Sequence, residues 1–551
     1  MTLLRAATLA ALLAVSVQPV LAAGTPHNVL IFVADGLRYV SVTPKSAPTL
    51  WRIKSQGVDF TNSHSLFPTI TTVNASAIAT GHYIGDTGNF GNTIFAGFGT
   101  PPVVGFEDDP TLGKMNDHFG GNYLNETSLI AAARDAGFAT AIMGKVGPTS
   151  IQDVTQRDGK GTIVIDDAFN TDEGITVAPE VLDAIKAAGL DPNAPKTDAP
   201  NNKQQRYMIS VATKVVLPKL ATSGKQFAML YWSRDPDMSQ HVQKDWTING
   251  PTGRAGIKDA DETLAALLDW LKANKLDKTT DVFVTADHGF STIDNMDAFG
   301  VARPSKFLAT DLGKALNLPV TKGAALGADP AHPDVLVVPN GGSDLIYLFG
   351  ADTKARAAQV VDQLSKLDYI SGVFVNDDLG DFPGSLPMSA INWRGTAITP
   401  HPSIVVSFAS HLMKGCKPEL MCAAETADTS LTTGQGMHGT FSRADTHNFM
   451  AAMGPDFKAR FADKAPVSNA DINPTLARIM GLHIRPKGGL VGRPVTEALK
   501  GGKSPAFSHS TLASAPAANG RKTVLEYQRV GDTRYFDAAG FPGRTVGLTG
   551  H

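Results

Sequence analysis

The sequence predicts an α/β fold with a mostly parallel central sheet flanked by helices. Three strand-length apolar runs, at 28–34, 227–232 and 281–286, are each followed within a few positions by an acidic residue. Such runs, when turn residues bound them, are typical of strands buried on both faces, as in parallel sheets. Between the second and third runs, residues 257–276 carry leucines at helical spacing. This order predicts a strand–helix–strand unit.

Each of these strands has an acidic residue at or just beyond its carboxyl end. The first ends at Asp35, the second leads into Asp237, and the third ends at Asp287. Ligands of open α/β sheets bind beyond the carboxyl ends of the strands, so we expect these residues to share one site. A further strand is expected at 138–143, ending at Gly144-Lys145.

Two later regions depart from this plan. Residues from about 298 to 436 mix strand-like and helix-like segments with Pro- and Gly-rich loops, which predicts an inserted cap beside the core. After residue 500, two strand-like segments at 523–530 and 533–536 flank Gly531-Asp532 and predict a C-terminal β-hairpin. The expected organisation is a leader at 1–22, a main domain at 23–500 that includes the cap, and a strand extension at 501–551.

The first 22 residues have the pattern of an export signal. Arg5 supplies the positive charge, residues 6–17 form the apolar stretch, and residues 20–22 end in a small-residue cleavage site. The alternative is a membrane anchor, but a spanning helix needs roughly 20 apolar residues, and Pro19 interrupts this stretch. We therefore expect cleavage and export to the periplasm or the medium, with no membrane association afterwards.

The overall composition is that of an ordinary globular protein. Of 551 residues, 42% are hydrophobic and 18% are charged. The formal net charge of -3 gives no electrostatic signal for nucleic acid or for an anionic membrane. The expected partner is a small molecule, and the composition carries no signal for an oligomeric state.

The chain has two cysteines, Cys416 and Cys422. In an exported protein their short spacing predicts a disulfide, with two free thiols as the alternative. The segment that begins at Cys416 nearly matches the Cys-x-Pro-x-Arg signature of sulfatases. Leu420 stands where that signature requires arginine, so we exclude a sulfatase.

Candidate metal ligands form two carboxylate–histidine pairs and one isolated histidine. Asp237 and His241 are four residues apart, a spacing that can direct both to one ion, and Asp287 and His288 adjoin at a strand end. His438 lies in a Gly-rich segment that gives the backbone freedom to approach the others. Asp and His are ligands that suit Zn²⁺. Each pair taken alone could also be a turn or a helix cap.

A run of threonines, Thr69, Thr71 and Thr72, offers a candidate nucleophile upstream of these pairs. A threonine hydroxyl is a poor nucleophile at neutral pH, and one common remedy is to bind it to a metal. Three Asp and three His are the ligands that two zinc-like ions would need. The combination indicates hydrolysis of a phosphate ester.

In its order along the chain, this array resembles the alkaline phosphatase superfamily, and most closely its nucleotide pyrophosphatase/phosphodiesterase branch. The resemblance extends from about His27 to Glu497. It implies an alkaline phosphatase-like catalytic domain, two zinc ions per chain and a covalent phosphothreonine intermediate. The matching residues are Asp35, Thr71, Asn92, Asp237, His241, Asp287, His288 and His438.

Carried over residue by residue, the resemblance implies that Thr71 is the nucleophile. Thr69 and Thr72 are local alternatives, and the spacing to Thr80-Gly81 and to Asn92 sets the register. Asn92, with the backbone N–H of Thr71, would hold the phosphoryl oxygens. One ion would be held by Asp35, Asp287, His288 and Thr71, and the other by Asp237, His241 and His438.

The chain departs from the branch at two places. Residues 72–75 stand where the branch has Phe-Pro-Asn-His, so the aromatic residue that helps to cradle a nucleotide base is missing. Related phosphate monoesterases use a Lys-x-Arg pair, of which only Lys145 is present, as either a phosphate ligand or a solvated strand-end lysine. The leading hypothesis is an exported di-zinc phosphodiesterase. The alternatives are an alkaline-type phosphate monoesterase, a phosphonate hydrolase and an inactive binding relative.

Overall fold

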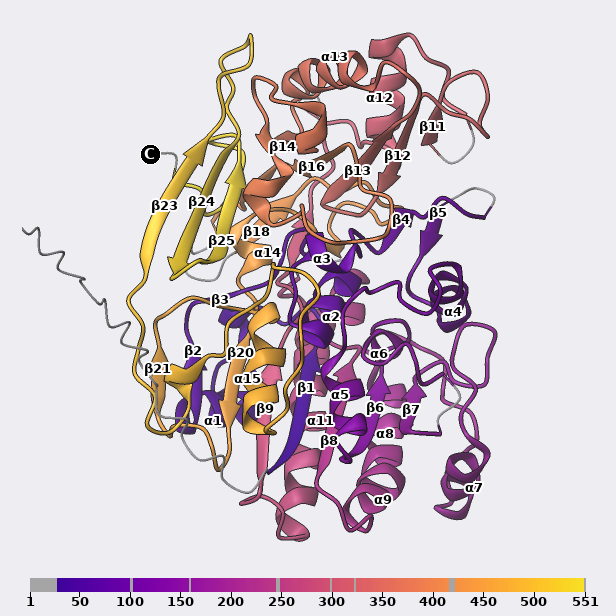
Figure 1. The fold of residues 1–551 in the computed structure, drawn as a ribbon, viewed down its shortest axis with the longest axis vertical. Coiled ribbons are helices and arrows are strands. Elements are labelled where there is room, and N and C mark those ends of the chain that lie inside the picture. The colour runs from indigo at the N-terminus through magenta and orange to yellow at the C-terminus, as the bar shows by residue number, and fades with distance from the viewer. Residues whose placement is uncertain are drawn as a thin grey trace, which may run out of the picture.

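The computed structural model describes residues 27–99, 103–157, 160–243, 248–297, 300–321, 324–415 and 422–549. Its central sheet has eight strands in the order β21-β2-β20-β9-β1-β8-β6-β7 (Figure 1). Five of the seven neighbouring pairs are parallel, and only the two pairs made by β20 are antiparallel. The predicted mostly parallel sheet is therefore confirmed. The strands are β1 (Asn28–Ala34), β2 (Val58–Phe60), β6 (Ala139–Gly144), β7 (Thr162–Asp166), β8 (Phe227–Ser233), β9 (Thr280–Thr285), β20 (Met450–Met453) and β21 (Phe461–Asp463).

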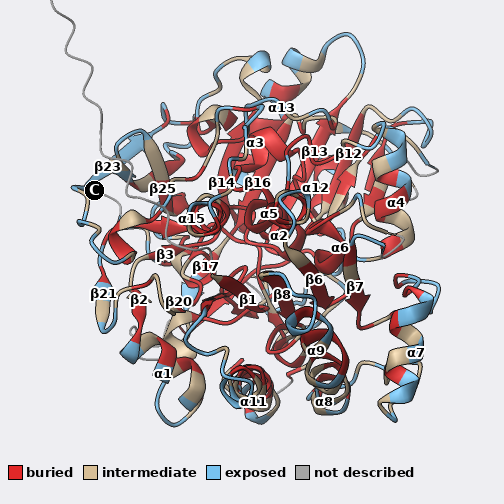
Figure 2. Ribbon diagram, turned by 60° about the horizontal axis from the view of Figure 1, so that its bottom comes forward, coloured by how far each residue is buried: buried red, intermediate tan, exposed pale blue. Residues whose placement is uncertain are grey.

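Helices cover both faces of this sheet, which explains why its central strands are apolar throughout. All residues of β1, β8 and β9 are buried. Figure 2 shows α1 (Pro48–Gln56), α8 (Asn202–Val211), α9 (Leu217–Ala221) and α11 (Pro251–Ala273) on one side. On the other side lie α2 (Thr71–Thr80), α5 (Leu129–Asp135) and α15 (Ile472–Ile479).

The helix expected between β8 and β9 is α11, which begins at Pro251 and ends at Ala273. Its first residue suits a helix start, because proline has no N–H to leave unpaired there. Leu264, Leu267 and Leu271 form the buried stripe that the spacing predicted. This helix connects two strands that both pair with β1 in parallel.

The region predicted as a cap contains a second sheet, in the order β11-β12-β13-β16-β14-β15. It packs with α12 (Phe307–Leu316) and α13 (Thr353–Lys366) around a separate buried cluster that includes Leu312, Val337 and Val361. The cap boundaries at 298 and 436 stay a prediction, and residues 298–299 lie outside the described residues. The strands are β11 (Ala325–Leu326), β12 (Val335–Pro339), β13 (Ser343–Leu348), β14 (Ile370–Val375), β15 (Leu386–Pro387) and β16 (Ile404–Phe408).

A small sheet in the order β17-β18-β10-β19 joins segments from both regions. Its strands are β10 (Ser291–Ile293), β17 (Ser410–Leu412), β18 (Ala423–Glu425) and β19 (Gly436–Met437). Since β10 closely follows the end of β9, and β19 leads directly to His438, this sheet positions a late segment of the chain beside the carboxyl ends of the central strands.

The C-terminal hairpin is present as β24 (Val524–Val530) and β25 (Thr533–Gly540). A third strand, β23 (Ser508–Ala513), pairs with β24 and completes the yellow sheet of Figure 1. The sequence did not reveal β23, because five of its six residues are exposed and it carries no alternating apolar pattern.

The predicted export signal and Cys416 both lie outside the described residues. Export and the pairing of Cys416 with Cys422 therefore stay predictions. Within the described residues, no helix is both long and apolar enough to cross a membrane.

Candidate active site

Four neighbouring strands bring the predicted site residues together at their carboxyl ends. Asp35 follows β1, Asp287 and His288 follow β9, and Lys145 follows β6. Beyond β8, Asp237 and His241 are the first and last residues of the short helix α10 (Asp237–His241). All the residues of this group are buried except His241, which is partly exposed. The fold thus brings these residues together at one edge of the sheet, as the sequence predicted.

The turn after β1 depends on Gly36, which has a φ of +67°. A Cβ at this position would lie 2.8 Å from the ring of Phe290 and in a backbone region that other residues rarely adopt. The Gly36 N–H donates to Asp287 Oδ1 at 2.9 Å. The glycine thus allows the end of β1 to bind the carboxylate at the end of β9.

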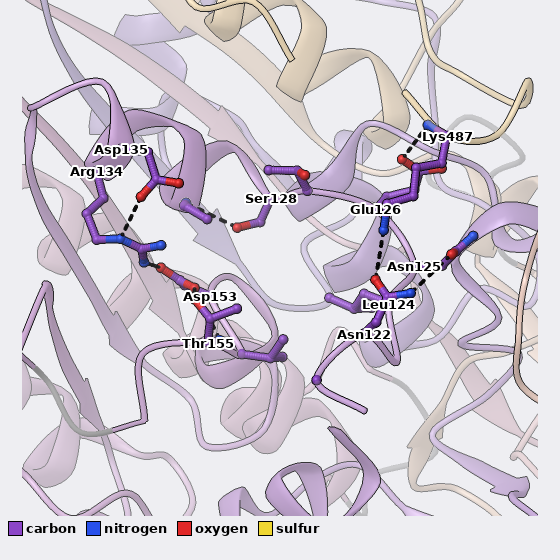
Figure 3. Close-up of a pocket in the computed structure, with 14 residues that line it drawn as sticks. Asn122, Leu124, Asn125, Glu126, Ser128, Arg134, Asp135, Asp153, Thr155 and Lys487 are labelled. Atoms are coloured by element: carbon purple, nitrogen blue, oxygen red, sulfur yellow. Dashed lines mark hydrogen bonds and ion pairs between the residues drawn. The ribbon is translucent and has the colours of Figure 1, made fainter. Parts of the chain in front are cut away.

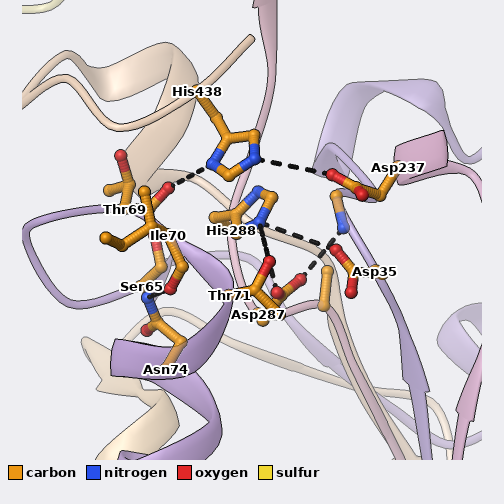
Figure 4. Close-up of polar contacts among 12 residues, drawn as sticks. Asp35, Ser65, Thr69, Ile70, Thr71, Asn74, Asp237, Asp287, His288 and His438 are labelled. Carbon is orange, nitrogen blue, oxygen red and sulfur yellow. Dashed lines mark hydrogen bonds and ion pairs between the residues drawn. The ribbon is translucent and has the colours of Figure 1, made fainter. Parts of the chain in front are cut away.

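Thr71 is the first residue of α2, a helix whose ten residues are all buried. Its Oγ lies 3.3 Å from His288 Nε2 (Figure 4). The same Oγ lies 3.4 Å from Lys145 Nζ. The two neighbouring hydroxyls are engaged elsewhere: Thr69 donates to the carbonyl of Thr440 at 2.8 Å, and Thr72 donates to the carbonyl of Gly91 at 3.0 Å. Among the three threonines, the hydroxyl of Thr71 is the one that contacts the His288 and Lys145 side chains.

Asn92 lies beside the N-terminus of α2. Its Oδ1 accepts a hydrogen bond from the Thr72 N–H at 3.0 Å. The first N–H groups of a helix have no acceptor within the helix and attract anions. This contact holds the Asn92 amide at the first turn of α2, the helix that Thr71 begins.

The three histidines share one orientation. The Nδ1 atoms of His241, His288 and His438 lie 2.9, 2.8 and 2.8 Å from the backbone carbonyls of Gly436, Gly289 and Thr69. A carbonyl only accepts, so each Nδ1 carries a proton and donates it, and each Nε2 faces the carboxylates. A histidine that binds a metal through Nε2 is commonly oriented in this way.

Three buried carboxylate oxygens of this site accept no hydrogen bond from the described residues: Asp35 Oδ1, Asp237 Oδ1 and Asp287 Oδ2. Each lies near a histidine Nε2. His241 Nε2 is 3.1 Å and His438 Nε2 is 3.5 Å from Asp237 Oδ1, and His288 Nε2 is 3.2 Å from Asp287 Oδ2. Buried charged oxygens without partners are costly. Carboxylate and imidazole groups that converge in this way fit bound divalent cations.

The other oxygens of the same carboxylates are held by protein donors. Lys145 Nζ lies 2.9 Å from Asp35 Oδ2 and 3.1 Å from Asp237 Oδ2. The indole N–H of Trp232 donates to Asp35 Oδ2 at 2.7 Å. Lys145 is 5% exposed, so it is buried in the site and not solvated at a strand end. Trp232 was missed from the sequence, where it is simply the last aromatic residue of an apolar run.

The ligand atoms form two adjoining groups, each spanning at most 4.8 Å. The first contains Asp35, Asp287 and His288, the set predicted for one ion apart from Thr71. The second contains Asp237 and His438 with His288, whose ring stacks on that of His438 at 3.6 Å between centroids. His241 also contacts Asp237, and its assignment to the second ion stays a prediction. The two groups share a side chain and form one continuous site.

Burial and neighbouring charges shift the pKa values of the side chains in this site in opposite directions. Burial raises the pKa of Asp35, and repulsion by the Asp237 carboxylate adds to the effect. Although burial opposes ionisation, the Lys145 ammonium holds the pKa of Asp237 well below its usual range. Burial lowers the pKa of His438 to about 3, and the neighbouring His288 contributes to that shift. Strong opposite shifts within one cluster are typical of functional sites.

A separate polar cavity of about 240 Å³ lies away from this cluster (Figure 3). None of the residues that line it belongs to the Thr71 site. Its charged groups already have partners: Arg134 binds Asp153, and Lys487 Nζ donates to Asn122 Oδ1 at 2.8 Å. We assign this cavity no role.

A threonine hydroxyl surrounded by buried Asp and His at the ends of parallel strands defines a metal-dependent hydrolase of phosphoric esters. The family model of type I phosphodiesterases and nucleotide pyrophosphatases matches residues 29–385, and the chain belongs to this family. Every predicted catalytic or metal-binding residue except His438 lies within the matched range.

Two of the solved structures that share the fold come from human and mouse. They are human ectonucleotide pyrophosphatase/phosphodiesterase 5, with a TM-score of 0.51, and the murine protein of the same name, with a TM-score of 0.53. Each is 16% identical to this chain, and the match covers 86% of this chain and 100% of the other. The murine structure is of an inactive threonine-to-alanine variant in complex with AMP. No curated protein sequence matches the chain.

Proposed function

We propose that the protein is an exported hydrolase that cleaves phosphodiester or pyrophosphate bonds through a covalent phosphothreonine at Thr71. The observation that carries this proposal is the position of the Thr71 hydroxyl. It starts a buried helix and lies within 3.4 Å of both His288 and Lys145, beside carboxylate oxygens that lack hydrogen-bond partners. Export rests on the charge and apolar pattern of residues 1–22.

Two divalent cations, zinc by the preference of these ligands, would acidify the threonine hydroxyl and stabilise the leaving oxygen. The residues that would hold one are Asp35, Asp287, His288 and Thr71, and those that would hold the other are Asp237, His241 and His438. The carboxylate oxygens without partners and the inward Nε2 atoms of these side chains support both assignments.

The residues of the chain then have distinct tasks. Thr71 Oγ forms the bond to phosphorus as the bond to the leaving oxygen breaks, and the threonine proton leaves to solvent. Asn92 and the N-terminus of α2 hold the phosphoryl oxygens. The Lys145 ammonium, 3.4 Å from Thr71 Oγ, favours the ionised hydroxyl. Water later breaks the bond between Oγ and phosphorus and regenerates Thr71. Positioning and charge account for most of the catalysis of phosphoryl transfer.

Substitution of the nucleophile tests this mechanism. Thr71→Ala should lower the hydrolysis of bis-p-nitrophenyl phosphate by on the order of 10³-fold or more, because the covalent route is lost. It should keep its zinc, since each ion retains three protein ligands. Thr72→Ala is the matched control, because the Thr72 hydroxyl donates to the Gly91 carbonyl at 3.0 Å and lies outside the site.

Acid-quenched digests add a direct readout. A phosphothreonine at residue 71 should be trapped from the parent protein and from Thr72→Ala, and it should be absent from Thr71→Ala. Near-normal turnover by Thr71→Ala would show that the assigned nucleophile is wrong. A metal-replete parent protein that hydrolyses no phosphate or phosphonate ester would instead be an inactive binding relative.

A phosphate monoesterase is the second candidate, and Lys145 is the observation that favours it. A buried ammonium beside the nucleophile could pair with the additional anionic oxygen of a monoester. The aromatic residue that this branch has after the nucleophile, and that helps to cradle a nucleotide base, is also missing. Its absence weakens the case for a nucleotide substrate, whereas the murine relative was solved in complex with AMP.

The diesterase and monoesterase candidates can be separated by measuring a diester and a monoester substrate on the parent protein and on Lys145→Met. The parent protein should prefer bis-p-nitrophenyl phosphate over p-nitrophenyl phosphate. Lys145→Met should lower kcat/KM for both by a similar factor, about 10²- to 10³-fold, as expected when one charged donor is lost from a phosphoryl site. A large preference for the monoester, with a loss in Lys145→Met confined to that substrate, would make the protein a monoesterase.

A further inference from the structure

A second cluster of potential ligands lies at the opposite edge of the central sheet. His27 immediately precedes β1, and Asp281 is the second residue of β9. Asp456 belongs to the loop that follows β20, a strand antiparallel to β9. These three residues therefore meet at the amino ends of β1 and β9, whereas the Thr71 site lies beyond their carboxyl ends.

The three side chains converge closely. His27 Nδ1 lies 2.7 Å from Asp456 Oδ2 and 3.7 Å from Asp281 Oδ2. Asp281 is fixed from the other side, because its Oδ1 accepts the Asp456 N–H at 3.0 Å. Gly454 allows this approach, since a Cβ there would lie 2.4 Å from Asp281 Oδ1. One atom from each residue lies within 4.8 Å of the others.

The buried member of the cluster lacks a partner. Asp281 Oδ2 has no exposure and accepts no hydrogen bond from the described residues, although it is directed toward His27 and Asp456. The nearby Lys500 ammonium donates to the Pro455 carbonyl. The side chains of His27 and Asp456 are 28% and 38% exposed, so the open side of the cluster faces solvent.

We propose that His27, Asp281 and Asp456 bind a divalent cation of the zinc class, at a site distinct from the Thr71 centre. One imidazole nitrogen and two carboxylate oxygens suit Zn²⁺, whereas Mg²⁺ and Ca²⁺ prefer oxygen ligands alone. Three protein ligands leave a position for water on the exposed side. The bound ion would join the start of β1 to β9 and to the loop after β20, so it would stabilise the folded chain.

The test is the zinc content of matched variants. The full chain, with any purification tag removed, is equilibrated with buffered micromolar free Zn²⁺ and its metal is counted by elemental analysis. His27→Ala and Asp456→Asn should each contain one zinc fewer per chain than the parent protein. Their kcat/KM should be unchanged, because neither residue contacts the Thr71 site.

His332→Ala is the control. His332 Nδ1 lies 2.9 Å from Asp329 Oδ2, a pair similar to that of His27 and Asp456 but exposed at the surface and outside every potential metal-binding group found among the described residues. This variant should keep the parent zinc content. A difference between variants does not depend on how many ions the Thr71 centre holds. Equal zinc in all four proteins would overturn the proposal and indicate that Asp281 and Asp456 share a proton.

A second readout uses stability. Added Zn²⁺ should raise the urea midpoint of the parent protein and of His332→Ala more than that of His27→Ala, because a ligand that binds only the folded state stabilises it. An identical increase in His27→Ala would contradict the site.

Discussion

At the scale of single residues, the two oxygens of one carboxylate have different surroundings. Asp35 Oδ2 accepts from Lys145 and from the Trp232 indole N–H, whereas Asp35 Oδ1 has no hydrogen-bond partner among the described residues. The donors therefore orient the carboxylate so that its free oxygen faces His288, 3.6 Å away. Such supporting hydrogen bonds tune how tightly a metal ligand binds.

Removal of the indole donor should weaken metal binding without removing a ligand. We expect Trp232→Phe to bind zinc about 10- to 100-fold more weakly, as measured by competition with a chelator of known affinity. Trp393→Phe is the matched control, because Trp393 is equally buried but its indole N–H donates to the Phe67 carbonyl at 3.0 Å. Equal zinc affinity in the two variants would show that the Trp232 hydrogen bond does not support the site.

At the scale of elements, the long central strands could be predicted because both of their faces are buried. Every residue of β1, β8 and β9 is buried, and strands buried on both faces need the apolar runs seen in the sequence. The strand β21, at one edge of the sheet, and its neighbour β2 have three residues each and include exposed or partly exposed positions, so they carry no such run. Their pairing depends on distant segments, which local patterns do not encode.

The same reasoning separates the parts of the site that could be predicted from those that could not. Asp35, Asp237 and Asp287 follow strand ends, and this placement alone predicts that they converge. Thr71 is distinguished from Thr69 and Thr72 only in the folded chain, where the latter two hydroxyls donate to backbone carbonyls outside the run of threonines. The alternatives for Lys145 were open because its burial depends on two carboxylates from other strands. Local sequence does not determine which of several candidate side chains a fold directs inward.

At the scale of the whole molecule, the C-terminal sheet connects the two hydrophobic cores. Leu525, Phe536 and Ala539 belong to the core of the central sheet, and Phe541 belongs to the core of the second sheet. The chain then contacts the small sheet, where the N–H of Ser410, the first residue of β17, donates to the Arg544 carbonyl at 2.9 Å. Residues 524–546 are therefore an integral part of the packing, although the sequence predicted only an extension.

This arrangement predicts that one aromatic residue in the last strand supports the entire fold. Phe536 is 5% exposed and lies edge-on to Phe441 and Tyr83, with ring centroids 6.3 Å apart in each pair. We expect Phe536→Ala to lower the free energy of unfolding by about 3–5 kcal/mol, because it leaves a cavity in the main core. Phe507→Ala is the control, since Phe507 is 40% exposed and its loss should change stability by at most about 0.5 kcal/mol. Urea unfolding of both variants measures the difference, and a similarly small effect of the two substitutions would mean that the C-terminal sheet adds little to the core.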